Sequence, residues 1–202
     1  LLLAVFLVVF VALGAAPRYR QDWLLENMLV LVAVPVLIFT RHRLRFSDFA
    51  YTCIFAFFCL HEIGAHYTYS EVPYDAWFQA AFGTSLDGLL GFERNHFDRL
   101  VHFLYGLLIT PAAIELFAHY GRYPRVWAAL FPMLFMVSHS AVYELIEWAA
   151  ALVFGGDLGQ AYLGTQGDVW DAQKDTALAA LGTSITVAAY ALADRLPRRM
   201  AP

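Results

Sequence analysis

The chain has 202 residues, of which 60% are hydrophobic and 15% charged, and its formal net charge is −4. A soluble domain of this length is nearer to one half apolar and one quarter charged, so the composition excludes an ordinary soluble domain and indicates an integral membrane protein. The chain has no basic patch that would suit a nucleic acid. It also lacks a polar segment long enough for a second domain, so residues 1–202 are expected to form a single integral membrane domain in contact with lipids.

Six apolar segments approach the roughly 20 residues that a helix needs to cross a bilayer. The sequence therefore predicts an all-α polytopic membrane bundle of about six transmembrane helices. The predicted spans are 1–16, 24–40, 48–66, 99–117, 126–150 and 175–193. The first segment could also pass for a signal-peptide core, an interpretation we disfavour because five further spans follow it.

Two long connections separate the later spans, at 67–98 and 151–174. Residues 74–82 are rich in aromatic and small side chains, which predicts a short helix lying at the membrane interface. The glycines of the second connection favour a turn ahead of a helix. Connections this long in a small bundle are usually functional or packed against the protein.

Orientation is predicted from the positive charges in the loops. With six spans, the 41–47 loop, the 118–125 loop and the C-terminal tail lie on one side and carry eight Lys or Arg residues, against five on the other side. The bias predicts that both termini are cytoplasmic. The two long connections would then lie on the outer side, although Arg18 and Arg20 argue the other way.

Ionisable side chains of metal-ligand and proton-transfer types collect near the predicted outer ends of four spans. At a helical rise of about 1.5 Å per residue, they fall in one layer of the membrane. Charge at that depth is costly, and by default it marks a functional site. The residues are His61, Glu62 and His66; Asp98 and His102; His139, Glu144 and Glu147; and Asp168, Asp171 and Asp175.

Their spacing places several of them on shared helix faces. Asp98 and His102 are four residues apart, and Glu144 and Glu147 are three apart, so each pair lies on one face. His61 and His66 are five apart, so both cannot point to the same place without a bend. The block H-E-x-x-x-H is one residue longer than the zincin motif, which excludes that reading.

Each group also has a plain structural interpretation. Asp98 could form a surface pair with Arg99, and Asp168 or Asp171 could cap the last helix. Glu144 and Glu147 could be bound by cations, and the candidates are Arg94, Arg99 and Lys174. Glu115 is too deep on its helix to join the layer, and we expect it to pair with Arg122, Arg125 or His119.

Four blocks resemble the YjdF-like family of bacterial inner-membrane proteins. They are HEIGAHYTY (61–69), FDRLVHFLYG (97–106), SAVYELIEW (140–148) and LGTQGDVWDAQKD (163–175). The resemblance covers roughly residues 45–190. It implies a multi-pass protein of the bacterial inner membrane and groups these blocks together, but it implies no reaction.

The first functional hypothesis is a metal-dependent, hydrolase-like enzyme acting on a lipid or lipid-linked substrate. Mixed imidazole and carboxylate ligands suit zinc, iron or manganese, and the many oxygens leave calcium or magnesium open. Glu147 would act as general base, with His139 beside it in the catalytic site. The predicted metal ligands are His61, His66, His102, Glu144, Asp171 and Asp175, with Glu62, Asp98 and Asp168 supporting them.

Two other hypotheses stay open. Buried acids and histidines also build proton relays and cation sites, so the chain could be a cation- or proton-coupled transporter. Against this, the chain shows no internal repeat, which secondary transporters often have. The third is a non-catalytic accessory subunit of a membrane complex, in which the polar layer is a buried ion-pair network. As to assembly, the chain could form a homo-oligomer or belong to a membrane complex.

Overall fold

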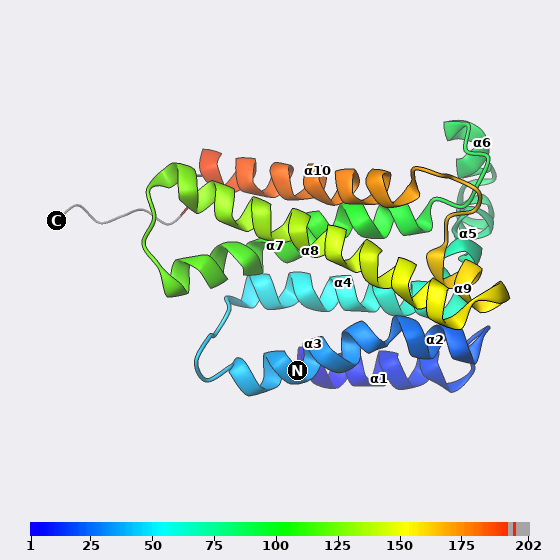
Figure 1. Ribbon diagram of the computed structural model, residues 1–202, viewed down its shortest axis with the longest axis horizontal. Coiled ribbons are helices and arrows are strands. Elements are labelled where there is room, and N and C mark those ends of the chain that lie inside the picture. The colour runs from blue at the N-terminus through cyan, green and yellow to red at the C-terminus, as the bar shows by residue number, and fades with distance from the viewer. Residues whose placement is uncertain (194–195, 197–202) are drawn as a thin grey trace.

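The computed structural model describes residues 1–193 and 196, and in this part of the chain all regular structure is helical. Long helices run side by side and antiparallel along one axis (Figure 1). In chain order the helices of the bundle are α1 (Leu2–Ala15), α2 (Arg20–Glu26), α3 (Met28–Thr40), α4 (Asp48–Tyr67), α7 (Phe97–Tyr120), α8 (Arg125–Phe154) and α10 (Asp171–Leu192), of which α2 and α3 together form one long segment. Short helices fill the two long connections: η1 (Tyr69–Glu71), α5 (Tyr74–Phe82), α6 (Leu86–Leu90) and α9 (Gly156–Leu163).

The predicted fold class is confirmed. Within the described residues, five helical segments are long and apolar enough to cross a membrane, counting α2 and α3 together as Arg20–Thr40, and α1 is a shorter apolar helix. The bounds differ from prediction where charged residues occupy helix ends. The second segment begins at Arg20 rather than residue 24, and α10 begins at Asp171 rather than 175. Acidic side chains are favourable in a first helical turn, which explains both extensions.

The end of the bundle where α4 and α8 finish and α7 and α10 begin is called the polar end below. The short helices α5, α6 and α9 lie across this end (Figure 1). The 41–47 loop and the 121–124 loop lie at the opposite end, together with the end of α10. Arg195, Arg198 and Arg199, on which part of the predicted orientation depends, lie outside the described residues.

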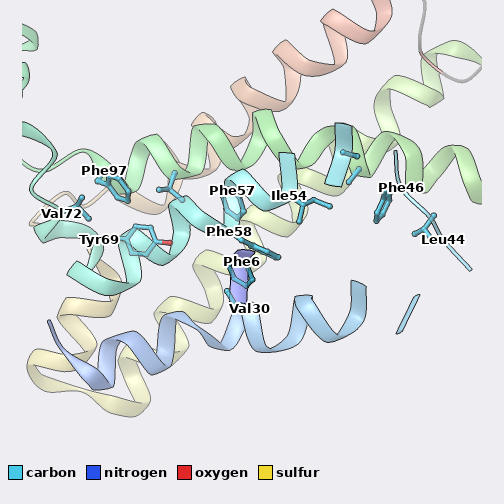
Figure 2. Packing of buried hydrophobic residues seen from close by; sticks show 13 residues of the cluster. Phe6, Val30, Leu44, Phe46, Ile54, Phe57, Phe58, Tyr69, Val72 and Phe97 are labelled. Carbon is cyan, nitrogen blue, oxygen red and sulfur yellow. The ribbon is translucent and has the colours of Figure 1, made fainter. Parts of the chain in front are cut away.

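Aromatic and aliphatic side chains pack α1, α3, α4 and α7 together. Figure 2 shows Phe6 of α1 and Val30 of α3 beside Phe58 of α4. The Phe6 and Phe58 ring centroids are 5.6 Å apart. Nearer the polar end, Tyr69 of η1 contacts Phe97 at the start of α7, with 6.0 Å between ring centroids. This packing holds η1 against the first turn of α7, where the candidate site begins.

The contact between α7 and α10 is the most extensive in the bundle. Small residues allow it: a Cβ at Gly106 would lie 2.0 Å from the Ala179 carbonyl oxygen, and one at Gly182 would lie 2.2 Å from the Phe103 carbonyl oxygen. Membrane helices use such residues to bring backbones close enough for van der Waals contact. The close approach fixes the first turns of α7 and α10 relative to each other.

Glu115 does not pair with Arg122, Arg125 or His119 as expected. Its carboxylate accepts hydrogen bonds from the Ser47 backbone N–H, at 2.7 Å, and from the Ser47 hydroxyl, at 2.5 Å. Ser47 is the N-cap of α4, and an anion is stabilised by the unpaired N–H groups and the dipole at a helix N-terminus. Glu115 therefore ties α7 to the start of α4, far from the polar end.

Candidate functional site

The first two turns of α7 carry the centre of the candidate site. Asp98 and His102 share a helix face, and the His102 Nε2 atom lies 3.6 Å from Asp98 Oδ1. His102 is 8% exposed. The i,i+4 spacing read from the sequence therefore produces a buried carboxylate–imidazole pair.

Two further helices bring carboxylates to this pair. Asp175 of α10 is 1% exposed, and one ligand atom each from Asp98, His102 and Asp175 all lie within 4.8 Å of one another. Glu144 of α8 places Oε1 3.4 Å from His102 Nε2. These four residues are called the carboxylate–histidine group. Neighbouring ligands with bonds of about 2.1 Å to a tetrahedral metal lie about 3.4 Å apart, so the group has spacings typical of a metal site.

The nearby cations bind other acids. Arg94 Nη2 lies 2.8 Å from Asp171 Oδ1, and Arg99 Nη2 contacts both Asp168 and Asp171. Lys174 Nζ lies 2.5 Å from Asp168 Oδ2. These five residues are called the ion-pair network. Within residues 1–193, no Lys or Arg side chain forms an ion pair with Asp98, Glu144 or Asp175, although Arg94 and Arg99 act on Asp98 from a longer distance.

Asp168 precedes α10 and belongs to this network, so it does not share a helix face with Asp171 and Asp175. Its carboxylate accepts a hydrogen bond from the Trp170 backbone N–H at 3.0 Å. The Lys174 ammonium, that N–H group and the Arg99 guanidinium hold the pKa of Asp168 well below its usual range. Asp171 likewise contacts arginines rather than the carboxylate–histidine group.

The low pKa of Asp168 predicts a pH-dependent contribution to stability. A carboxyl group with a depressed folded-state pKa stabilises the fold above its unfolded-state value, about 4, and loses that contribution as the pH falls below it. We expect Asp168→Asn to lower the melting temperature at pH 7 and to differ progressively less from wild type as the pH falls below about 4. Thermal unfolding in detergent across this range measures the difference, with the exposed Glu93→Gln as control. A difference that does not change with pH would contradict the assignment.

A small cavity adjoins the carboxylate–histidine group. Its volume is about 50 Å³, which holds a few water molecules. Asp98 and His102 of α7 line the cavity. The two predicted catalytic residues, Glu147 and His139, line it from α8. His139 Nδ1 is 2.8 Å from the Tyr105 hydroxyl.

The predicted residues of α4 point in different directions. His61 is buried, lines the cavity and is hydrogen-bonded to the Tyr69 hydroxyl. Burial raises the pKa of Tyr69, and nearby carboxylates raise it further, so this hydroxyl stays protonated. His66 instead contacts the Leu13 carbonyl oxygen at 2.8 Å, away from the cavity. Glu62 faces Trp23 and Asn27. Residues five apart do not share a helix face, which explains why His61 faces the cavity and His66 does not.

Sequence reasoning missed two buried acids of α2. Asp22 accepts a hydrogen bond from the Thr68 hydroxyl at 2.9 Å, and Glu26 lines the cavity, 3.4 Å from the Tyr143 hydroxyl. Both lie in a turn that sequence analysis placed before or at the start of the second span. The available signal was the i,i+4 spacing of two acids immediately before an apolar run.

Comparisons with known proteins agree with this architecture. The family model described as "Predicted membrane protein (DUF2238)" matches residues 1–195. "Inner membrane protein YjdF" of Escherichia coli (strain K12) is 36% identical over 176 residues, which cover 86% of this chain and 79% of that relative. No solved structure matches the chain.

Proposed function

This chain belongs to the DUF2238 family of predicted membrane proteins, and from its polar end we propose that it is a metal-dependent enzyme that hydrolyses a lipid or lipid-linked substrate. The similarity to an inner-membrane protein supports a place in that membrane. The observation that carries the proposal is the carboxylate–histidine group, in which ligand atoms of Asp98, His102 and Asp175 lie within 4.8 Å of one another. His102 and Asp175 are buried and Asp98 is half-buried.

The charge balance favours a bound cation over a simple ion-pair network. Removing ionised carboxylates from water without compensation is strongly unfavourable. Arg94, Arg99 and Lys174 are engaged by Asp168 and Asp171. Asp175 Oδ1 and Glu144 Oε1 are buried atoms without a hydrogen-bond partner among the described residues. A divalent cation would satisfy both atoms and offset the charge.

The chain supplies groups for hydrolysis beside this position. A divalent cation there would polarise a carbonyl or phosphoryl oxygen and lower the pKa of a bound water. Glu147 lies one helical turn from Glu144 and lines the cavity, so it is placed to take a proton from that water. The water oxygen then bonds to the carbonyl carbon or phosphorus, the bond to the leaving oxygen breaks, and Glu147 returns its proton to that oxygen.

Elemental analysis of the purified, tag-free protein tests the proposal. We expect about one equivalent of a transition metal or of Ca²⁺ or Mg²⁺ in wild type. His102→Ala, Asp175→Asn and Glu144→Gln each remove a donor and should weaken metal affinity by about 100-fold or more. His42→Ala, at an exposed histidine of the opposite end, is the matched control and should keep the metal.

Two results would contradict the metal site. One is wild-type protein that binds no divalent metal in equilibrium dialysis. The other is a set of variants that keep wild-type affinity. Retention of metal by a folded His102→Ala protein is the more specific of these outcomes, because His102 is the nitrogen donor of the group.

A further inference from the structure

The cavity has a second polar side, formed by Glu26 of α2. Glu26 is 6% exposed, and its carboxylate accepts a hydrogen bond from the Tyr143 hydroxyl, 3.4 Å from Oε2. In the described part of the chain no Lys or Arg forms an ion pair with it. A buried carboxylate without a cation is unfavourable in its charged form. A cationic ligand in the cavity would stabilise that form.

The walls around Glu26 suit an organic cation. Tyrosines from four elements line the cavity, and the lining contains no Lys or Arg. The rings of Tyr, like those of Trp and Phe, attract ammonium groups through their negative faces. Ser140 is 2% exposed, lines the same cavity, and its Oγ has no hydrogen-bond partner among the described residues. The tyrosines are Tyr69, Tyr105, Tyr143 and Tyr162.

We propose that the Glu26 side of the cavity binds the primary ammonium group of an amine-bearing phospholipid. The inference names the substrate class of the hydrolytic site and in that sense rests on the proposed function. Glu26 would accept a charge-assisted hydrogen bond from the ammonium group. Ser140 Oγ offers a second acceptor, and the tyrosine rings form part of the remaining wall.

An ammonium group fits this side better than a second metal ion does. Among the described residues the metal-spaced group comprises Asp98, His102 and Asp175, and Glu26 is not part of it. The volume of about 50 Å³ is enough for a group the size of an ammonium ion. A quaternary trimethylammonium group is larger and cannot donate hydrogen bonds, so the cavity should prefer a primary amine.

The cavity lining reaches the lipid-facing surface. Leu29 of α3 is half-buried and His139 of α8 is exposed, and both line the cavity. The neighbouring side chains of Met28 and Val142 are 56% and 52% exposed. A head group that entered beside Leu29 and His139 would leave its acyl chains in the hydrocarbon, so the position suits a phospholipid better than a soluble amine.

The two polar sides of the cavity meet at Tyr143. The ring centroids of His102 and Tyr143 are 6.3 Å apart, and the Tyr143 hydroxyl reaches Glu26. Tyr143 therefore lies beside both His102 and Glu26. A phosphodiester next to the bound ammonium group would face the carboxylate–histidine group.

Binding of short-chain phospholipids to protein purified in a maltoside detergent tests this inference. The probes are dihexanoyl phosphatidylethanolamine, phosphatidylcholine and phosphatidylglycerol. Wild type should prefer the ethanolamine lipid by about tenfold or more over each of the others. Glu26→Gln should reduce that preference to less than about threefold, while Glu93→Gln, at an exposed acid of the same end, should keep it.

Further measurements separate this inference from misfolding and from the metal proposal. Ethylammonium chloride should displace the ethanolamine lipid from wild type, and ethanol at the same concentration should not. Glu26→Gln should keep the wild-type metal content, which shows that the variant folds.

Equal affinity for all three lipids, or an unchanged preference in Glu26→Gln, would overturn the ammonium site. Absence of metal in a wild type that still prefers the amine lipid would overturn only the proposed hydrolase.

Discussion

Replacing Gly106 by alanine is expected to destabilise the bundle by about 3 kcal/mol, near the upper end of the usual effect of overpacking. The added Cβ would lie 2.0 Å from the Ala179 carbonyl oxygen and 2.8 Å from the Thr183 backbone nitrogen. Both atoms belong to the α10 backbone and cannot rotate away, so the two helices must separate. The same displacement moves Asp175 away from Asp98 and His102, so metal binding should fall together with stability.

The matched control is Ala188→Leu, which adds bulk to an exposed position of α10. It should change the free energy of unfolding by no more than about 0.5 kcal/mol. Unfolding by SDS titration in mixed micelles measures both variants. A Gly106→Ala protein as stable as this control would show that α7 and α10 do not approach as closely as described.

Removing the Arg99 guanidinium is expected to destabilise the protein by about 2 kcal/mol. Arg99 contacts Asp168 and Asp171, and Asp171 is 5% exposed. In Arg99→Met, Asp171 keeps Arg94 but loses one of its two positive partners. The expected loss is below that of a fully broken buried pair because Arg94 and Lys174 remain.

A double substitution isolates the charge effect. Arg99→Met combined with Asp171→Asn removes the uncompensated charge, so it should recover part of the stability lost in Arg99→Met alone. Arg43→Met, at an exposed arginine of the opposite end, should leave the free energy of unfolding within about 0.5 kcal/mol of wild type. Losses that simply add in the double variant would argue against direct coupling between Arg99 and Asp171.

The polar residues away from the polar end form contacts between and within helices. Glu115 is bound to Ser47 near the opposite end. Between the two ends, Thr110 and Thr186 donate hydrogen bonds to backbone carbonyl oxygens of α7. Among the described residues these groups satisfy helix contacts and do not form a continuous polar path. A continuous path is what a proton or cation relay across the bundle would need.

Much of the architecture follows from hydropathy and spacing alone. The apolar segments predicted an all-α membrane bundle, since a bilayer-length apolar run has few alternatives to a spanning helix. The helical rise per residue predicted that acids and histidines of several spans lie at one depth in the membrane. Helical periodicity placed Asp98 with His102 on one face, a pairing that the structure contains. Element ends were less certain, because Asp22, Glu26 and Asp171 look like loop residues in an apolar chain.

The sequence is thus enough to predict the fold class, the depth along the helices at which the polar residues lie, and the pairs within each helix. Tertiary structure decided which acids meet which partners: Asp171 lies with two arginines, Asp98 joins His102 and Asp175, and Glu26 enters the cavity from α2. The physical reason is that partner choice depends on the rotation and axial shift of each helix. Those are set by contacts such as the glycine-mediated approach of α7 and α10, which periodicity within one helix does not encode.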